Sequence, residues 1–250
     1  MDPTTRHVHA AGASPEQGTC ELPPDEARPG PPPAGARGER RWGRQAEAER
    51  NDHLVLEAAR TVFAEQGAGA PMSALAERAG VGIATFYRRY GSKETLLQRL
   101  CLLSMEESIA SAREVLAGED DGWSAVAAFV RRCVAARVGS LGSAAGTIIV
   151  TQEMTAASEL GRELMDELVR RAQADGTVRR DLTALDVSYL IEHFSRIPRG
   201  TDEQANVSRR LLALALDGLR EREPRSSLPG TPPSWESYSG RWYDSSGTGR

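Results

Sequence analysis

Lysine is nearly absent from this sequence of 250 residues: Lys93 is the only one, and arginines provide the other positively charged side chains. No apolar run reaches the ~18 residues that a membrane span needs. The N-terminal stretch also lacks an apolar segment of the kind found in signal peptides. We therefore expect a soluble, cytoplasmic protein with no membrane partner.

Cysteine is scarce as well. Cys20, Cys101 and Cys133 share no spacing typical of a metal site, and an odd number of thiols fits a reducing compartment. The four histidines are scattered, and the sequence has no glycine-rich phosphate loop, HExxH, GxSxG or CxxC motif. We expect no metal, no cofactor and no catalytic residue, which leaves an enzyme as a weak alternative.

Both ends of the chain contain too few apolar residues to build a core. Residues 1–44 are rich in Pro, Gly, Ala and Glu and end in a basic arm that includes Arg41 and Arg44. Residues 224–250 have a similar composition, so we expect both segments to be disordered. The second segment also contains four aromatic residues: Trp235, Tyr238, Trp242 and Tyr243. A short aromatic motif that docks on its own protein or on a partner is the alternative to a mobile tail.

Helix signals dominate the region between these segments, so the predicted fold class is all-α. Apolar spacing and end signals predict helices over about 46–67, 73–80, 82–91, 92–117, 123–138, 145–157, 159–174, 184–196 and 203–222. Ser73 and Ser92 are the expected N-caps of two of them, and Gly67 and Gly80 the expected ends of two others. The only candidate strand is GTIIV, residues 146–150, and its surroundings favour helix.

Two of these helices are too short to be stable alone. They are joined through Gly80-Val81-Gly82, with the small Ala76 placed where two helix backbones would cross closely. This spacing predicts a helix-turn-helix over about residues 71–90, whose second helix enters the major groove of DNA. An ordinary helical hairpin inside a larger bundle is the alternative. The residues on the second helix favour DNA, because Thr85, Tyr87, Arg88 and Arg89 crowd polar and cationic groups together.

These side chains suit distinct contacts with DNA. Thr85 can touch a base edge or a phosphate, Tyr87 can reach a phosphate, and Arg88 or Arg89 can pair with guanine or with phosphates. Gly82 and Ala84 are small enough to let the start of the helix approach the DNA backbone. Phe86 and Tyr90 are expected to face inward. For the basic arm with Arg41 and Arg44, a minor-groove contact and a solvated charge run are equally good interpretations.

Lys93 follows the Ser92 cap, in the first turn of the next helix. A positive charge there opposes the helix dipole at a cost of a few tenths of a kcal/mol. An anion bound at the helix end removes this conflict, because the backbone amides and the ammonium then hold it together. We expect that anion to be a DNA phosphate.

Residues 47–100 resemble the N-terminal domain of the TetR family of bacterial transcriptional regulators. The resemblance rests on the stretches ARTVFAEQG, LAERAGV and TFYRRYGSKE. It implies a three-helix DNA-binding domain over 45–93, followed by a larger helical domain over 94–223 that binds a small-molecule effector and forms a homodimer. By position it implies these DNA contacts: Ser73, Gly82, Ala84, Thr85, Tyr87, Arg88, Arg89 and Lys93. Met72-Ser73-Ala74 departs from the usual family pattern, which weakens the assignment of Ser73.

The resemblance beyond residue 100 is one of pattern only. LVRRAQADGTVRRDLTALDV is similar to the family's hinge between late helices, with a glycine turn and an Arg-Asp pair. VSRRLLALALDGLR is similar to its final helix, with Leu212, Ala215 and Leu219 on a stripe that forms either a dimer interface or an internal core. The predicted effector pocket has six walls: Trp123, Phe129, Met154, Tyr189, His193 and Phe194. For each of them, core packing is the alternative.

The function predicted from the sequence is a transcriptional repressor. It binds a palindromic double-stranded DNA operator as a homodimer, and a small-molecule effector releases it by favouring a conformer with mis-spaced reading helices. A helical adaptor that uses its aromatic tail and no DNA is the remaining alternative.

Overall fold

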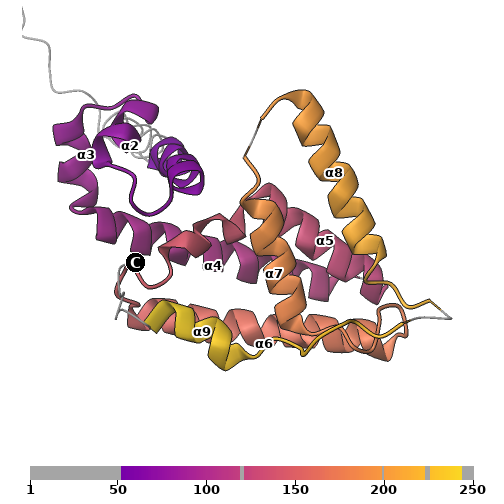
Figure 1. Ribbon diagram of the computed structural model, residues 1–250. Helices are drawn as coiled ribbons and strands as arrows, with labels where there is room; N and C mark the ends of the chain where they lie inside the picture. The colour runs from indigo at the N-terminus through magenta and orange to yellow at the C-terminus, as the bar shows by residue number, and fades with distance from the viewer. Residues whose placement is uncertain (1–51, 119–120, 199, 223–225, 244–250) are drawn as a thin grey trace, which may run out of the picture. The chain divides into compact units, whose positions relative to one another are not determined.

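The computed structural model describes residues 52–118, 121–198, 200–222 and 226–243. Residues 52–66 form a helix. Eight labelled α-helices and a 3₁₀ helix follow (Figure 1): α2 (Met72–Arg78), α3 (Ile83–Tyr90), α4 (Lys93–Ala117), α5 (Gly122–Ala135), η1 (Val138–Ala144), α6 (Gln152–Ala174), α7 (Ala184–Ser195), α8 (Asp202–Asp217) and α9 (Trp235–Tyr243). These residues contain no strand, only one isolated bridge between Val178 and Arg220. The all-α prediction is confirmed.

Several predicted helix ends lie where the sequence placed them. Gly67 and Gly80 adopt left-handed φ values of 77° and 68°, which non-glycine side chains rarely tolerate. The Ser92 side chain accepts a hydrogen bond of 3.1 Å from the Thr95 amide. The cap predicted for the second helix is wrong, because Pro71 holds that position without a side-chain bond and Ser73 lies inside α2.

The first core lies under the two short helices. Phe63, Leu75, Phe86, Leu96 and Leu100 are almost fully buried in it. The same core continues into η1 and α6 through Leu141, Ala144 and Met154. The described residues accordingly form one compact unit. The domain boundary predicted near residue 93 is therefore not marked by a break in packing, and it stays a prediction.

The second core is built by α4, α5, α6 and α7. α4 packs along α6 and α5, and α5 packs on α6 and α7. Phe129, Val130, Leu168 and Val187 fill the space between them. None of the described helices has the combination of length and apolar character that a bilayer crossing requires.

Two helices predicted over 145–157 and 159–174 are one helix. α6 runs without a break from Gln152 to Ala174, and Thr151 caps it by accepting a bond from the Met154 amide. The preceding residues 145–151 are irregular and contain Gly146 at a φ of 72°. GTIIV is thus neither helix nor strand, and side chains of α4 form hydrogen bonds with the backbone of Ile149. The Gln98 amide nitrogen donates to the Ile149 carbonyl at 2.9 Å, and the Ile149 amide donates to Glu94 at 3.0 Å.

The end of the chain departs most from expectation. The sequence predicts no order from residue 224 onward, but Trp235–Tyr243 form α9, which lies along α6 in Figure 1. Thr155 on α6 and Tyr243 share a hydrogen bond of 3.3 Å. The alternative of an aromatic motif docked on its own chain describes these residues correctly. Residues 1–51 and 244–250 lie outside the described residues, so the disorder expected there stays a prediction.

Candidate nucleic-acid interface and effector cavity

The turn between α2 and α3 brings two short helices together over one core. The Val81 amide donates to the Ala76 carbonyl at 3.0 Å, which closes the turn after Gly80. Phe86 and Tyr90 point into the core from α3, and their rings lie 5.0 Å apart. Each of these helices is too short to be stable alone, so its tertiary contacts stabilise it. The geometry is that of a helix-turn-helix.

The inward position of Phe86 and Tyr90 leaves the polar residues of α3 on the surface. Seven predicted DNA contacts are exposed: Ser73, Gly82, Ala84, Thr85, Tyr87, Arg88 and Arg89. Lys93 is half-buried in the first turn of α4. The structure therefore brings the predicted residues together on α2, α3 and the start of α4. Arg41 and Arg44 lie outside the described residues.

Asp52 fixes the C-terminal end of α3. It accepts a hydrogen bond of 2.6 Å from the Tyr90 hydroxyl and forms an ion pair of 2.9 Å with Arg89. Burial, followed by the bond to Asp52, raises the pKa of Tyr90 above its usual range, so the hydroxyl stays a donor. Arg89 therefore has a structural partner, whereas Arg88 makes no side-chain hydrogen bond or ion pair with the described residues. Of the two arginines, Arg88 is the better candidate for reading a base.

A cavity of about 200 Å³ lies in the helical region that follows. It is enclosed by α4, η1, α6, α7 and α9, with one residue from the loop before α6. Its apolar wall includes Met105, Leu141, Val150, Met154, Met165 and Ile191, and α9 adds Trp235, Tyr238, Trp242 and Tyr243. Its polar lining consists of hydroxyl groups, one carboxylate and one guanidinium: Ser104, Ser108, Thr155, Ser158, Ser188, Ser239, Glu192 and Arg162. Such a mixture of apolar walls and few polar groups is typical of small-molecule sites.

Only Met154 of the six predicted pocket walls lines this cavity. Trp123 instead donates to the Leu216 carbonyl at 3.4 Å, and Arg220 stacks on its ring at 4.0 Å. Phe129 is buried in the second core. His193 and Phe194 pack edge-on against each other. For Trp123, Phe129 and Phe194 the structure favours the packing alternative, whereas His193 is exposed and fits neither interpretation.

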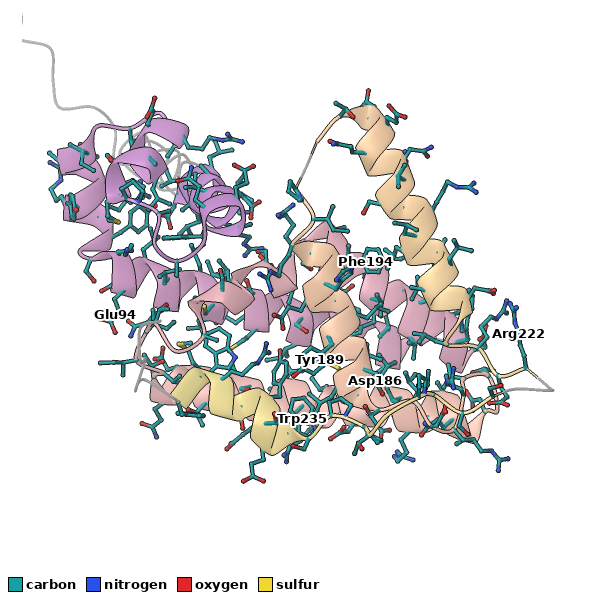
Figure 2. The ribbon with its side chains drawn as sticks, in the orientation of Figure 1. Glu94, Asp186, Tyr189, Phe194, Arg222 and Trp235 are labelled. Carbon is teal, nitrogen blue, oxygen red and sulfur yellow. The ribbon has the colours of Figure 1, made fainter. Side chains whose placement is uncertain are left out.

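Tyr189, the sixth, lies beside the cavity rather than in its wall. Its ring packs edge-on against Tyr238 of α9 at 5.4 Å, and Figure 2 shows it on α7 with Trp235 on the neighbouring helix. The sequence reasoning missed the α9 walls. Their signal was present, because Trp235, Tyr238 and Trp242 have the i, i+3, i+7 spacing of one helical face.

Arg60 joins the first helix to the helices around the cavity. It is almost fully buried, and its guanidinium donates to Glu107 on α4 at 2.9 Å and to the Ala136 carbonyl after α5 at 2.7 Å. A buried arginine needs such partners, because an unpaired charge in the interior is very costly. Arg60 thus adds a buried polar link from the helix over 52–66 to α4 and to the end of α5.

Two family models match this chain. Residues 55–100 match the model described as bacterial regulatory proteins of the tetR family, and residues 123–221 match the C-terminal domain of SbtR-like transcriptional regulators. Together the matches cover more than half of the sequence. The chain belongs to the TetR family. It is a DNA-binding transcriptional regulator, and the resemblance seen in the sequence is confirmed.

Individual relatives are distant from this TetR-family regulator. The transcriptional regulator UidR of Escherichia coli K12 is 35% identical over 75 residues, which cover 30% of this chain and 38% of UidR. A TetR regulator from Mycobacterium vanbaalenii is 30% identical, with 71% of this chain and 99% of that one covered and a TM-score of 0.48. The ketosteroid regulator KstR2 of Mycobacterium tuberculosis is 18% identical, with 69% and 96% covered and a TM-score of 0.50. The last of these likenesses supports the fold alone. Helix α9 lies outside both family matches.

Proposed function

We propose that this regulator is a repressor that binds a palindromic operator as a homodimer and is released by a small-molecule effector. In this proposal residues 45–93 bind DNA, and residues 94–223 bind the effector and form the dimer. The observation that carries it is the surface of α3, where polar and cationic side chains are exposed above a filled core. A helix that served only packing would not expose Thr85, Tyr87 and Arg88 side by side.

The roles on DNA follow from position and chemistry. Arg88 reads a base edge, since it is exposed on α3 and has no other partner among the described side chains. Thr85 and Tyr87 hold phosphates, while Gly82 and Ala84 let the helix start approach the backbone. Lys93 and the amides at the start of α4 hold a further phosphate. Ser73 and Arg89 contribute at the edge of this surface, and Arg41 and Arg44 reach the adjacent groove.

The dimer surface differs from the one that the sequence suggested. Leu212 and Leu219 pack partly against their own second core, so the stripe of Leu212, Ala215 and Leu219 faces inward. The opposite face of α8 exposes 49% of Val207, 49% of Leu211 and 66% of Leu214. Leu216 is the only buried residue of this helix. We place the dimer contact on Val207, Leu211 and Leu214, because an exposed apolar row of this kind fits a second copy of the same helix.

A short path of contacts joins the cavity to the DNA-binding surface. Val150 and Met154 line the cavity. Ile149, directly before Val150, is hydrogen-bonded to Glu94 and Gln98 in the first two turns of α4. Figure 2 shows Glu94 at this end of α4, next to Lys93 in the sequence. An effector that moves Val150 therefore shifts the start of α4, and it lowers DNA affinity by its differential affinity for the two positions.

The test is selection of bound duplexes from a random pool by the full chain. We expect an enriched site with two inverted half-sites whose centres lie about one helical turn, ~34–36 Å, apart. Genomic footprinting on the same protein should then recover this site near a small number of genes. A pool that shows no enrichment, or a single unrepeated half-site, would contradict the proposal.

A further inference from the structure

Glu192 of α7 is a carboxylate in the cavity wall, and Arg241 of α9 compensates its charge. The residue is only 8% exposed. Arg241 of α9 donates to both of its carboxylate oxygens, at 3.4 and 3.1 Å. Arg196 is a weaker partner, because it lies 3.7 Å away and is largely exposed. A buried carboxylate without a cation is strongly unfavourable, so α9 provides a charge that the cavity wall needs.

Aromatic rings surround the cation as well. The Arg241 guanidinium lies 4.4 Å from the ring centre of Tyr238 and 5.3 Å from that of Tyr189. Trp235 packs edge-on against Tyr238 at 5.6 Å. Rings at these distances attract a cation through their negative faces. Burial, with a further contribution from Glu192, raises the pKa of Tyr238, which keeps that ring neutral. One carboxylate and two tyrosines thus form a receptor for a flat monocation.

The chain keeps space for this carboxylate. A side-chain carbon on Gly142 would lie 2.4 Å from one Glu192 carboxylate oxygen, and one on Gly139 would lie 2.5 Å from the Glu192 Cα. Both glycines belong to η1 and line the cavity. Any larger residue at either position would push η1 away from α7 or displace the carboxylate. Glu192 is therefore fitted closely into the wall.

Apart from Glu192, Arg162 and several hydroxyl groups, the cavity wall is apolar, and the cavity is small. Three methionines line it, Met105, Met154 and Met165, and its volume is about 200 Å³. For comparison, a cavity of roughly 150 Å³ is large enough to bind benzene. A ligand that pairs with Glu192 and fills this space would combine a cationic head with an apolar body near the size of a substituted benzene.

We propose that Glu192 is the recognition group for an organic monocation with an apolar body, and that Arg241 of α9 holds this site as a tethered competitor. The inference rests on the proposed effector function and names the ligand class of that same cavity. Arg241 and Tyr189 do not line the cavity themselves but hold Glu192 and Tyr238 at its wall. A cation that enters takes the place of the guanidinium on Glu192, and α9 loses its only ion pair among the described residues.

The probes are phenethylguanidinium and its neutral isostere phenethylurea, titrated calorimetrically into the full chain without DNA. The two differ in charge but little in shape, so their affinity ratio reports the carboxylate. We expect the guanidinium to bind at least about tenfold more tightly, because a charge-assisted pair replaces a neutral hydrogen bond. Equal affinities, or no binding of either probe, would overturn the inference.

Two substitutions separate the roles of the partners. Glu192→Gln should abolish the preference for the guanidinium. Arg241→Met keeps the apolar stem but removes the competing charge, so guanidinium affinity should rise by about tenfold or more while urea affinity stays within about twofold. Two results would contradict the proposal that a ligand cation displaces Arg241 from Glu192. One is a guanidinium preference that survives Glu192→Gln, and the other is an unchanged guanidinium affinity in Arg241→Met.

Matched controls exclude indirect effects. Arg113→Met removes an exposed arginine of α4 that neither lines the cavity nor pairs with Glu192, so both affinities should be unchanged. Arg241→Lys keeps a cation but loses the two-pronged contact, so guanidinium affinity should rise less than in Arg241→Met. Thermal melting of each variant verifies folding. If Arg241→Met melts much earlier, guanidinium should raise its melting temperature and urea should not, which tests the same pairing by a second readout.

Addition of the probes to the protein–operator complex separates this inference from the proposed function. Release by guanidinium but not by urea supports both. Guanidinium that binds to the free chain without affecting the operator complex leaves the cation site intact and contradicts the proposed mechanism of release. A neutral compound that releases the operator while guanidinium fails to bind would overturn the cation site and leave the repressor proposal standing.

Discussion

α3 and α8 both expose side chains that do not stabilise the fold of the monomer, but the chemistry of the two sets is opposite. α3 exposes Thr85, Tyr87 and Arg88. α8 exposes Val207, Leu211 and Leu214. Cationic and hydroxyl groups on a short helix suit a polyanion. For an apolar row, removal of its surface from water is favourable, so it suits an apolar partner. The contrast supports the proposal made above, in which α3 contacts DNA and α8 contacts a second copy of the chain.

The two surfaces also differ in what lies beneath them. Phe86 and Tyr90 anchor α3 in a filled core, so its outer side chains can change without loss of folding. α8 is anchored mainly at its C-terminal end, where Leu216 is buried and its carbonyl accepts a hydrogen bond from the Trp123 ring. Substitutions on the two helices should therefore separate dimer formation, base reading and general attraction to DNA.

The largest effect is expected on α8. Leu211→Arg combined with Leu214→Arg places two charges in the apolar row, so the chain should become monomeric by light scattering. Operator affinity should fall by at least about 100-fold, since the second half-site no longer adds to the first. Glu159→Arg with Glu163→Arg adds two arginines to an exposed face of α6 and should leave the dimer intact. A dimer that survives the α8 change would place the interface elsewhere.

Arg88→Ala should have the next largest effect. We expect a loss of about 1–3 kcal/mol on the selected operator and relaxed specificity at one base position. The dimer and the free energy of unfolding should be unchanged, because Arg88 is exposed. Binding curves on a set of single-base operator variants measure both quantities.

Two neighbouring changes test the assignment of Arg88. Arg113→Ala removes an exposed arginine near the far end of α4 and should change neither affinity nor specificity. Arg89→Ala breaks the ion pair with Asp52 and should cost up to about 1 kcal/mol of unfolding free energy. If Arg89→Ala blurs a base position and Arg88→Ala does not, the two roles must be exchanged.

The smallest effect is expected at Lys93. Lys93→Ala should weaken binding about equally on specific and random DNA, and the slope of log K against log salt should become shallower by ~1. Salt titrations of the variant and the unaltered chain on one operator measure this slope. If Lys93 is only a solvated first-turn residue, alanine will leave binding unchanged and will slightly stabilise α4 by removing an unfavourable charge from its N-terminus.

The sequence predicted the α3 surface well and the cavity poorly, for a physical reason. Gly80, Ala76, Phe86 and Tyr90 are close in sequence, and local helix geometry alone decides which of their neighbours face outward. The cavity walls come from segments as distant as Cys101 and Tyr243, and only their packing brings them together. Periodicity shows that Phe129 is apolar on a helix but cannot show whether it faces a core or a void.

α9 shows a second limit. Its composition, with prolines and serines before an aromatic run, predicts a segment that does not fold alone. In the chain, α9 is stabilised by the ion pair with Glu192, by ring packing on Tyr189 and by contacts with the other elements around the cavity. A prediction from local composition does not include such contacts.

The use of lysine at a single position makes the start of α4 a chemically unique place. Apart from the amino terminus, Lys93 carries the only primary amine in the sequence. An amine-selective reagent therefore attaches one internal label, half-buried beside the Ser92 cap, without any engineered residue. Acylation of this nitrogen removes its charge, and bound DNA should shield it, so the extent of modification becomes a direct record of occupancy.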